Sequence, residues 1–196
     1  GDGNSNRTKR YKVGSYSLRI VGDSRYDYFY LTEYVAPLFK ELFDIVPRIG
    51  KFKTENAAYV EGHGLNLVNF LEQKGFKPGN KIKNKLNIPT WIKNDSAFLA
   101  ACLRGLFDTD GSFYKLTNQS SCQILFKNHN LVLLNDVRQS LLSLGINCSK
   151  VSKQNSVYIT KKSEIKRFLS IIGLSNAKHI TRVNMFFNIV QASRIV

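Results

Sequence analysis

Two short segments of the chain place apolar and polar residues at alternate positions, which is the pattern of a half-buried β-strand. In residues 15–21, three apolar side chains share one face, and Ser17 and Arg19 lie on the other. Residues 121–127 repeat this alternation, with Gln123 on the polar face. Both segments are therefore predicted to be strands with one face toward a hydrophobic core.

The same order of elements follows each of these strands. Apolar residues at helical spacing predict helices over 26–44 and 130–145, and further helices over 65–76 and 164–174. Between the two helices of each copy, short alternating runs predict pairs of strands. These strands are predicted at 48–54 and 56–62 in the first copy and at 148–153 and 156–160 in the second. The duplicated pattern predicts an α+β protein built from two repeats.

An Asp-Gly pair stands before the first strand of each copy, at residues 2–3 and 110–111. The second pair ends a helical segment, whereas the first has no helical pattern in front of it. The repeated unit is therefore predicted as helix, two strands, helix, two strands, helix, with the opening helix absent from the first copy. We predict the boundaries of the two repeats at 1–93 and 94–196.

Small residues occupy every fourth position of the helix that ends at the second Asp-Gly pair. They are Ala97, Ala101, Gly105 and Thr109. Such a stripe lets another helix approach closely, because the distance between two helices follows the side chains at their contact. In a duplicated protein the equivalent helix would lie opposite, and the carboxylates of Asp2 and Asp110 would converge. A divalent cation is the simplest way to stabilise two converging carboxylates.

The net charge of the chain indicates which class of molecule the protein binds. The chain carries 29 Lys and Arg against 14 Asp and Glu, a net charge of +15 at pH 7. This excess favours a polyanion, and nucleic acid ahead of a membrane, since no basic amphipathic helix and no run of about 18 apolar residues is evident. The three cysteines form no CxxC pair, which argues against a disulfide framework and a zinc site. They predict an intracellular protein, cytoplasmic or organellar, rather than a secreted one.

Residues 103–111, LRGLFDTDG, resemble the LAGLIDADG motif of homing endonucleases, and six of the nine letters are identical. The GDG at residues 1–3 is similar to the end of a first copy of the motif. Residues 22–43 and 87–92 are similar to stretches of intein-encoded and archaeal intron-encoded members. The resemblance implies a pseudo-symmetric monomer in which two antiparallel sheets form a DNA-binding saddle around paired motif helices.

The resemblance also implies an activity, namely Mg²⁺-dependent hydrolysis of both strands of double-stranded DNA at a long recognition site, in intron or intein homing. Asp2 and Asp110 match the motif's metal ligand, and the backbone carbonyls of Gly1 and Thr109 would help to hold the metal. Asp108 would support the helix instead. Hard Mg²⁺ prefers such carboxylate oxygens together with waters and substrate phosphate.

Peripheral lysines complete such sites in the family and steady the water network. Lys178 occupies the expected place in the second copy, and Lys81, with Lys83 as an equal candidate, occupies it in the first. DNA-contacting residues are expected on the polar faces of the sheets and in their loops. They are Ser17, Arg19, Lys51, Lys53, Gln119, Gln123, Lys127, Lys150 and Lys153. Arg and Gln suit base edges, and most Lys would meet phosphates.

Two other functions fit the same scaffold. One is a maturase that binds intron RNA and assists splicing without cleaving DNA. The other is a DNA-binding module that has lost the chemistry, although an Asp at both motif positions argues against this alternative. A second polypeptide is a further candidate partner, because it would supply the opening helix that the first copy lacks.

Overall fold

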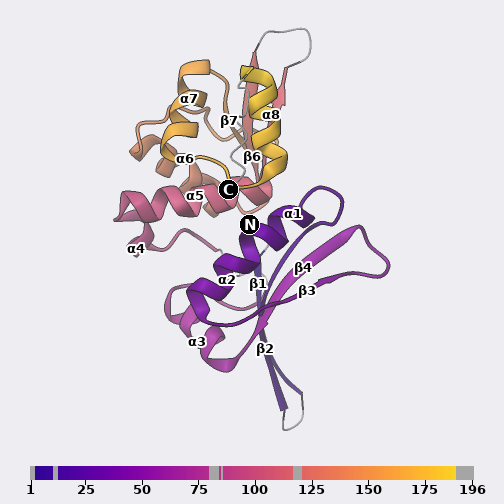
Figure 1. The fold of residues 1–196 in the computed structure, drawn as a ribbon. Helices are drawn as coiled ribbons and strands as arrows, with labels where there is room; N and C mark the ends of the chain where they lie inside the picture. The colour runs from indigo at the N-terminus through magenta and orange to yellow at the C-terminus, as the bar shows by residue number, and fades with distance from the viewer. Residues whose placement is uncertain (1–2, 11–12, 80–83, 85, 117–120, 189–196) are drawn as a thin grey trace.

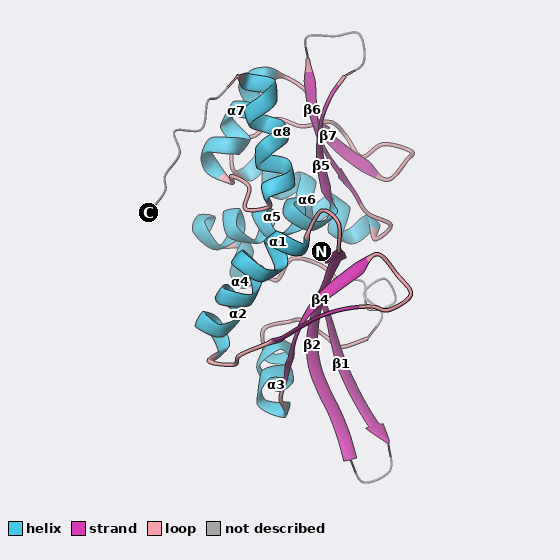
Figure 2. Cartoon of the chain, turned by 45° about the vertical axis from the view of Figure 1, so that its right-hand side comes forward, coloured by secondary structure: helices cyan, strands magenta, loops and turns pink. Residues whose placement is uncertain are grey.

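The computed structural model describes residues 3–10, 13–79, 84, 86–116 and 121–188. Within these residues the chain forms two antiparallel sheets, one in each half, with the helices mainly on one side of both sheets (Figures 1 and 2). The first sheet contains β1 (Gly3–Arg10), β2 (Val13–Asp23), β3 (Arg48–Lys51) and β4 (Ala57–His63). The second contains β5 (Gly111–Lys115), β6 (Cys122–Lys127) and β7 (Ser156–Ile159).

The helices of the first half and of the connection are α1 (Tyr28–Tyr30), η1 (Leu31–Val35), α2 (Ala36–Phe43), α3 (Leu65–Gln73) and α4 (Thr90–Lys93). Those of the second half are α5 (Ser96–Asp110), α6 (Leu131–Ser143), α7 (Lys162–Ile171) and α8 (Ala177–Phe187). In the described part of the chain, no helix is long and apolar enough to cross a membrane.

The two sheets share a register at their first strands. Gly3 begins β1 and pairs with Ile20, and Gly111 begins β5 and pairs with Phe126. In both halves the glycine of the Asp-Gly pair thus opposes the sixth residue of the alternating segment. The predicted α+β class with two antiparallel sheets is confirmed, and the shared register supports the predicted duplication.

The prediction of a strand at 148–153 is wrong, and the second sheet has three described strands, in the order β5-β6-β7. Ser149 explains part of the difference, because its hydroxyl accepts the backbone N–H of Tyr158 at 3.0 Å in place of a ladder carbonyl. Serine side chains compete with the backbone in this way. The first sheet has the order β1-β2-β4-β3. The repeated unit predicts a strand before residues 15–21, but the residues of β1 are almost all polar, so no alternation of apolar and polar residues marks its position.

The predicted helix over 26–44 is observed as one continuous helical segment, α1–η1–α2, and η1 is a π-helical turn. Pro37 lies in the first turn of α2, where its missing N–H leaves one helical carbonyl without its usual donor. The turn before it widens accordingly. Helix α8 is an element that the periodicity does not predict.

Each half has its own hydrophobic cluster. Leu31, Phe39 and Val60 are among the buried residues of the first cluster, and the second is larger. Ile88 and Ile92, which precede α5, pack in the second cluster. The core of the second half therefore begins before residue 94, and the boundary between the repeats stays a prediction.

Helix α5 lies between the two halves (Figure 1). Its N-cap is Asp95, whose carboxylate accepts the N–H groups of Ala97 and Phe98 in the first turn. Leu103 and Phe107 are buried in the second cluster, whereas Ala101 and Gly105 of the small-residue stripe are exposed. A methyl group at Gly105 would meet no atom within 4 Å. In the described structure, therefore, the stripe has no helix against it.

Candidate nucleic-acid interface and catalytic centre

Asp110 is the last residue of α5 and leads directly into β5. Asn128, which follows β6, donates an amide hydrogen bond to its carboxylate at 3.0 Å. Gly111 must be a glycine, because a Cβ there would lie 2.4 Å from the carbonyl oxygen of Phe107. The chain can therefore turn from helix to strand at once, and the half-buried carboxylate of Asp110 stays beside the start of the sheet.

Asp108, two residues earlier, faces the protein interior and is 1% exposed. Its carboxylate accepts the backbone N–H groups of Ser175 and Asn176 at 2.9–3.0 Å. Burial raises the pKa of Asp108, and the N–H bonds from Asn176 and Ser175 oppose this rise. The carboxylate thus satisfies the backbone donors that lead into α8, and it agrees with the supporting role implied for the motif's first acid.

A buried amide continues this contact into the first half. The Asn176 side chain donates to the backbone oxygen of Asp108 at 3.1 Å and to the carboxylate of Asp27 at 2.7 Å. Lys178 also reaches Asp27, with its Nζ 2.7 Å from the carboxylate oxygen. Asp27, Asp108, Asn176 and Thr109 all line one small cavity at this junction. The sequence analysis did not select Asp27, because no local pattern shows a partner that lies about 150 residues away.

The polar face of the first sheet carries a compact charged group. Arg19 on β2 binds the carboxylate of Glu61 on β4 at 2.8–2.9 Å, and its guanidinium lies 5.0 Å from the ring centre of Tyr59. His63 lies on the other side of Glu61, at 3.4 Å. Arg48 pairs with Glu61 in the register of β3 and shares this face, although the sequence analysis did not select it. Arg19 is therefore held in place before any ligand arrives.

Several residues that were predicted to contact DNA lie on another face of the sheet or are less exposed than expected. Lys51 lies on the helix-covered side of the first sheet, where its Nζ is 4.4 Å from the ring centre of Tyr28, so its predicted place on the polar face is wrong. The reason is register, since Lys51 pairs with the core residue Ala58. Ser17 and Gln123 do lie on polar faces but are buried, at 5% and 8% exposure. They offer a ligand little surface.

The other predicted contacts fall into two groups. Lys127 is exposed at the end of β6, and Lys53, Lys150 and Lys153 are exposed in loops. Some predicted residues lie outside the described part of the chain. They are Gly1, Asp2, Lys81, Lys83 and Gln119.

Comparison with known proteins bears on this geometry. Residues 97–173 match the family described as the LAGLIDADG-like domain. That segment of the chain is therefore similar to LAGLIDADG-like domains. It begins inside α5 and ends just after α7, so it contains the helix that carries Asp108 and Asp110. A search of curated protein sequences found no match.

The whole fold is similar to the solved structures of the homing endonuclease I-DmoI and of the LAGLIDADG meganuclease I-AabMI. The structure of I-DmoI in complex with DNA and Mn is 17% identical, with a TM-score of 0.57, and the match covers 88% of this chain and 90% of that chain. The LAGLIDADG meganuclease I-AabMI bound to uncleaved DNA is 11% identical, with a TM-score of 0.58 and coverage of 96% and 86%. The chain therefore has the fold of these nucleases over most of its length.

The oxygen donors at the end of α5 suit a hard cation, although the set is incomplete in the described residues. Asp110 offers carboxylate oxygens, and the backbone carbonyl of Thr109 is adjacent, which is oxygen chemistry of the kind that Mg²⁺ prefers. No group of three or more His, Cys, Asp or Glu that could hold a metal occurs among the described residues. The second predicted acid, Asp2, is not among them.

His179 gives a testable pH dependence. It is 1% exposed in the first turn of α8, and burial lowers its pKa to about 4. The unfolded chain, with an ordinary histidine pKa of about 6.5, takes up this proton first as the pH falls. The stability associated with neutral His179 is therefore complete above about pH 6.5 and is lost toward pH 4, by at most about 1.4 kcal/mol per pH unit.

Urea unfolding at pH 7.5 and pH 5.0 measures this effect. We expect His179→Leu to lose less stability between the two pH values than the unmodified protein. His129→Gln, at an exposed histidine, is the matched control and should keep the original pH dependence. Equal pH dependence in all three proteins would contradict the assignment.

Proposed function

We propose that this protein is a site-specific DNA endonuclease that hydrolyses both strands of a long recognition site with the help of a divalent metal. The observation that carries the proposal is the position of Asp110. It is the last residue of α5 and is followed directly by β5, and Asn128 orients its carboxylate through a hydrogen bond. A reactive phosphate above this point would lie between the polar faces of the two sheets, where the protein can also read sequence.

The proposed reaction requires a divalent metal ion in addition to the side chains of the protein. I-DmoI was solved with DNA and Mn and also with DNA and Ca. When bound, such ions activate a water and stabilise the leaving oxygen in phosphodiester hydrolysis. We propose that Asp110 and the carbonyl of Thr109 hold an ion in the second repeat, and that Asp2 and the carbonyl of Gly1 do so in the first.

Residues around the acids would orient the substrate. We propose that Lys178 steadies the charged phosphate and its water network, with Asp27 as the residue that positions its ammonium group. Lys81 or Lys83 would act in the same way in the first repeat. The exposed face of α5 is where we propose that the opening helix of the first repeat packs, whether it belongs to the same chain or to a second polypeptide.

DNA binding would use the polar faces and their loops. Arg19 presents a fixed guanidinium that can make a bidentate contact with a guanine edge, and it is 40% exposed on its side chain. Lys127 and Lys150 are exposed cations suited to phosphates. A chain of net charge +15 would attract any duplex, and the fixed polar groups would select the sequence.

The catalytic role of Asp110 can be tested with a near-isosteric change. Asp110→Asn keeps an oxygen that accepts from Asn128 but removes the charge that holds the metal. On a duplex selected for binding from a random pool, cleavage with Mg²⁺ should fall by more than about 100-fold, since metal stabilisation of the transition state is worth several kcal/mol. The dissociation constant for the duplex in Ca²⁺ should change by less than about twofold.

The matched control for this experiment is Asp44→Asn. Asp44 is an exposed acid that also ends a helix, so the control removes the same charge from a similar position. It should cleave normally. If Asp110→Asn cleaves as well as Asp44→Asn while Mg²⁺ is still required, Asp110 is not a metal ligand.

Sequence reading and phosphate binding can be separated at Arg19 and Lys127. Arg19→Ala would remove the arginine partner of Glu61 on the proposed DNA-facing surface, so the informative variant is Arg19→Ala combined with Glu61→Gln. This double variant should lose about 1–3 kcal/mol on the selected duplex and little on a scrambled one. Lys127→Ala should weaken both duplexes alike and lower the salt slope by about one.

Fluorescence anisotropy at several salt concentrations measures both effects. The intact protein should lose roughly 10³–10⁵ in affinity between about 50 and 200 mM salt if it contacts about 6–10 phosphates. Equal losses of the double variant on both duplexes would show that Arg19 does not read bases. An affinity that does not change with salt concentration would contradict the proposed DNA-binding surface as a whole.

A further inference from the structure

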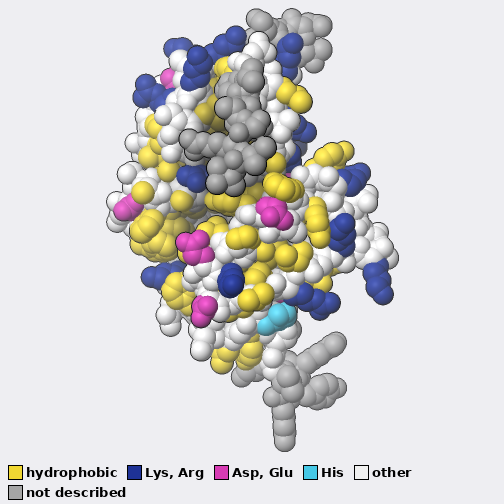
Figure 3. Space-filling view, in the orientation of Figure 1, with side chains coloured by type: hydrophobic (Ala, Val, Ile, Leu, Met, Phe, Trp, Pro, Cys, Tyr) yellow, Lys and Arg dark blue, Asp and Glu magenta, His cyan; other side chains and the backbone are white. Residues whose placement is uncertain are grey.

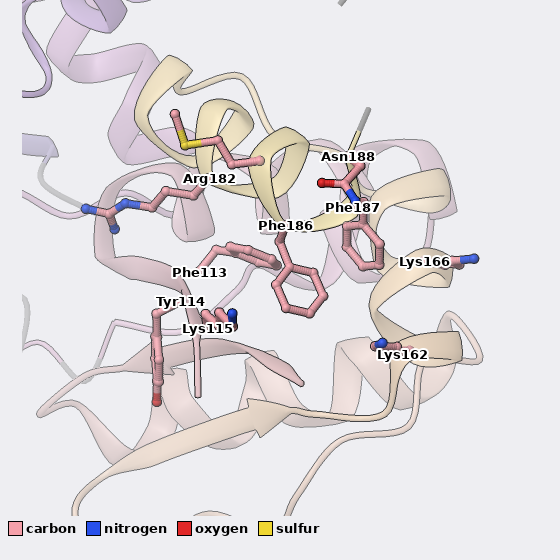
Figure 4. Close-up of a pocket in the computed structure, with 10 residues that line it drawn as sticks. Phe113, Tyr114, Lys115, Lys162, Lys166, Arg182, Phe186, Phe187 and Asn188 are labelled. Atoms are coloured by element: carbon pink, nitrogen blue, oxygen red, sulfur yellow. The ribbon is translucent and has the colours of Figure 1, made fainter. Parts of the chain in front are cut away.

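A large pocket lies at the distal end of the second half, away from Asp110. It has a volume of about 940 Å³ and opens between α8, the start of α7 and the outer edge of β5 (Figure 4). We call it the edge pocket, because β5 is the edge strand of its sheet. Its lining residues are Phe113, Tyr114, Lys115, Lys162, Lys166, Arg182, Met185, Phe186, Phe187 and Asn188.

The charges of the edge pocket are all positive. Lys115, Lys162, Lys166 and Arg182 line it, no acid does, and none of the four forms an ion pair among the described residues. In Figure 3, Lys and Arg side chains gather at this end of the molecule. Among the described residues, these four cations therefore have no acidic partner, and they would attract an anion.

Two of these cations sit where a helix disfavours them. Lys162 is the first residue of α7, next to the positive end of the helix dipole, and Lys166 lies one turn further on the same face. Like charges four residues apart destabilise a helix by about 0.2–0.5 kcal/mol. An anion bound between them would reverse both penalties, so this arrangement points to a bound anion more strongly than scattered surface lysines would.

The floor of the edge pocket is aromatic. Phe186 packs edge-on against the buried Phe113, with ring centres 6.0 Å apart, and Phe187 lies 5.0 Å from Phe186. Both Phe186 and Phe187 are only half-buried, and the Nζ of Lys162 is 5.6 Å from the Phe186 ring centre. Half-buried aromatic rings beside cations match the two parts of a nucleotide, because bases stack on aromatic rings and phosphates meet Lys and Arg.

The nucleotide must come from a single strand. A base in a duplex is stacked and paired, so it cannot reach the aromatic rings of a pocket, whereas an unpaired base can be turned outward. We propose that the edge pocket binds single-stranded nucleic acid, either RNA or unpaired DNA, with phosphates on Lys162 and Lys166 and a base on Phe186 and Phe187. This inference is independent of cleavage at Asp110.

Anisotropy with labelled ten-nucleotide single strands of RNA and of DNA tests the proposal in the full chain. Lys162→Gln combined with Lys166→Gln should weaken binding of these strands about tenfold and lower the salt slope by about 1.4, the value for two phosphates on a single strand. Affinity for a duplex should change less than twofold. A stronger effect on RNA than on DNA would identify RNA as the source, and equal effects would identify any unpaired strand.

The matched control is Lys40→Gln combined with Lys77→Gln, which removes the same charge from exposed positions of the first half. It should leave single-strand binding nearly unchanged. Equal losses in both pairs of variants would overturn the proposal, because a general effect of net charge would explain them.

Stacking has its own readout. A strand containing 2-aminopurine should lose fluorescence on binding, and Phe187→Ala should abolish this quenching and reduce affinity at least fivefold. If Phe187→Ala is poorly folded, the lysine variants still test the proposal, because Lys162 and Lys166 are exposed and their replacement does not disturb the core. Fluorescence that stays unquenched with the intact protein, or inorganic polyphosphate that competes as well as the oligonucleotide, would show a simple anion patch and contradict a nucleotide site.

Discussion

The structure depends on one buried carboxylate. The carboxylate of Asp108 is buried at the junction between the two halves, where it accepts the backbone N–H groups of Ser175 and Asn176 that lead into α8. The side chain of Asn176 also donates to Asp27, so it links this contact to the first half. A buried charge is tolerated only when donors surround it, and removal of one partner from such a network is costly. This contact therefore holds the end of α5, the start of α8 and the first half in one arrangement.

The two acids at the end of α5 have different environments because of this arrangement. Residues two apart on a helix do not share a face, so with Asp108 turned inward, Asp110 points elsewhere, toward Asn128 and the start of the sheet. The negative end of the helix disfavours both carboxylates. Backbone N–H groups bind the carboxylate of Asp108, whereas the carboxylate of Asp110 is half-buried and accepts a hydrogen bond from Asn128. The same junction sets Lys178 against Asp27, close to Thr109.

Local patterns predicted the elements that carry this site, and long-range contacts account for what they missed. The alternating segment 121–127 predicted β6, and the motif at 103–111 predicted the end of α5. Both were visible because an element that buries one face has apolar residues at regular intervals. The sequence of β1 contains no such regular apolar positions. The face of Lys51 depended on a pairing register, and the contact between Asp27 and Lys178 depended on the packing of the two halves.

The central claim is that a divalent metal binds beside Asp110 when DNA is present, and paramagnetic broadening tests it most directly. The ¹⁵N-labelled full chain, bound to a selected duplex in Ca²⁺, would be titrated with Mn²⁺. The account predicts that the amide signals of residues 109–112 and of Asn128 broaden first, while those of α3 and α7 persist. Uniform broadening, or broadening centred away from the end of α5, would contradict it.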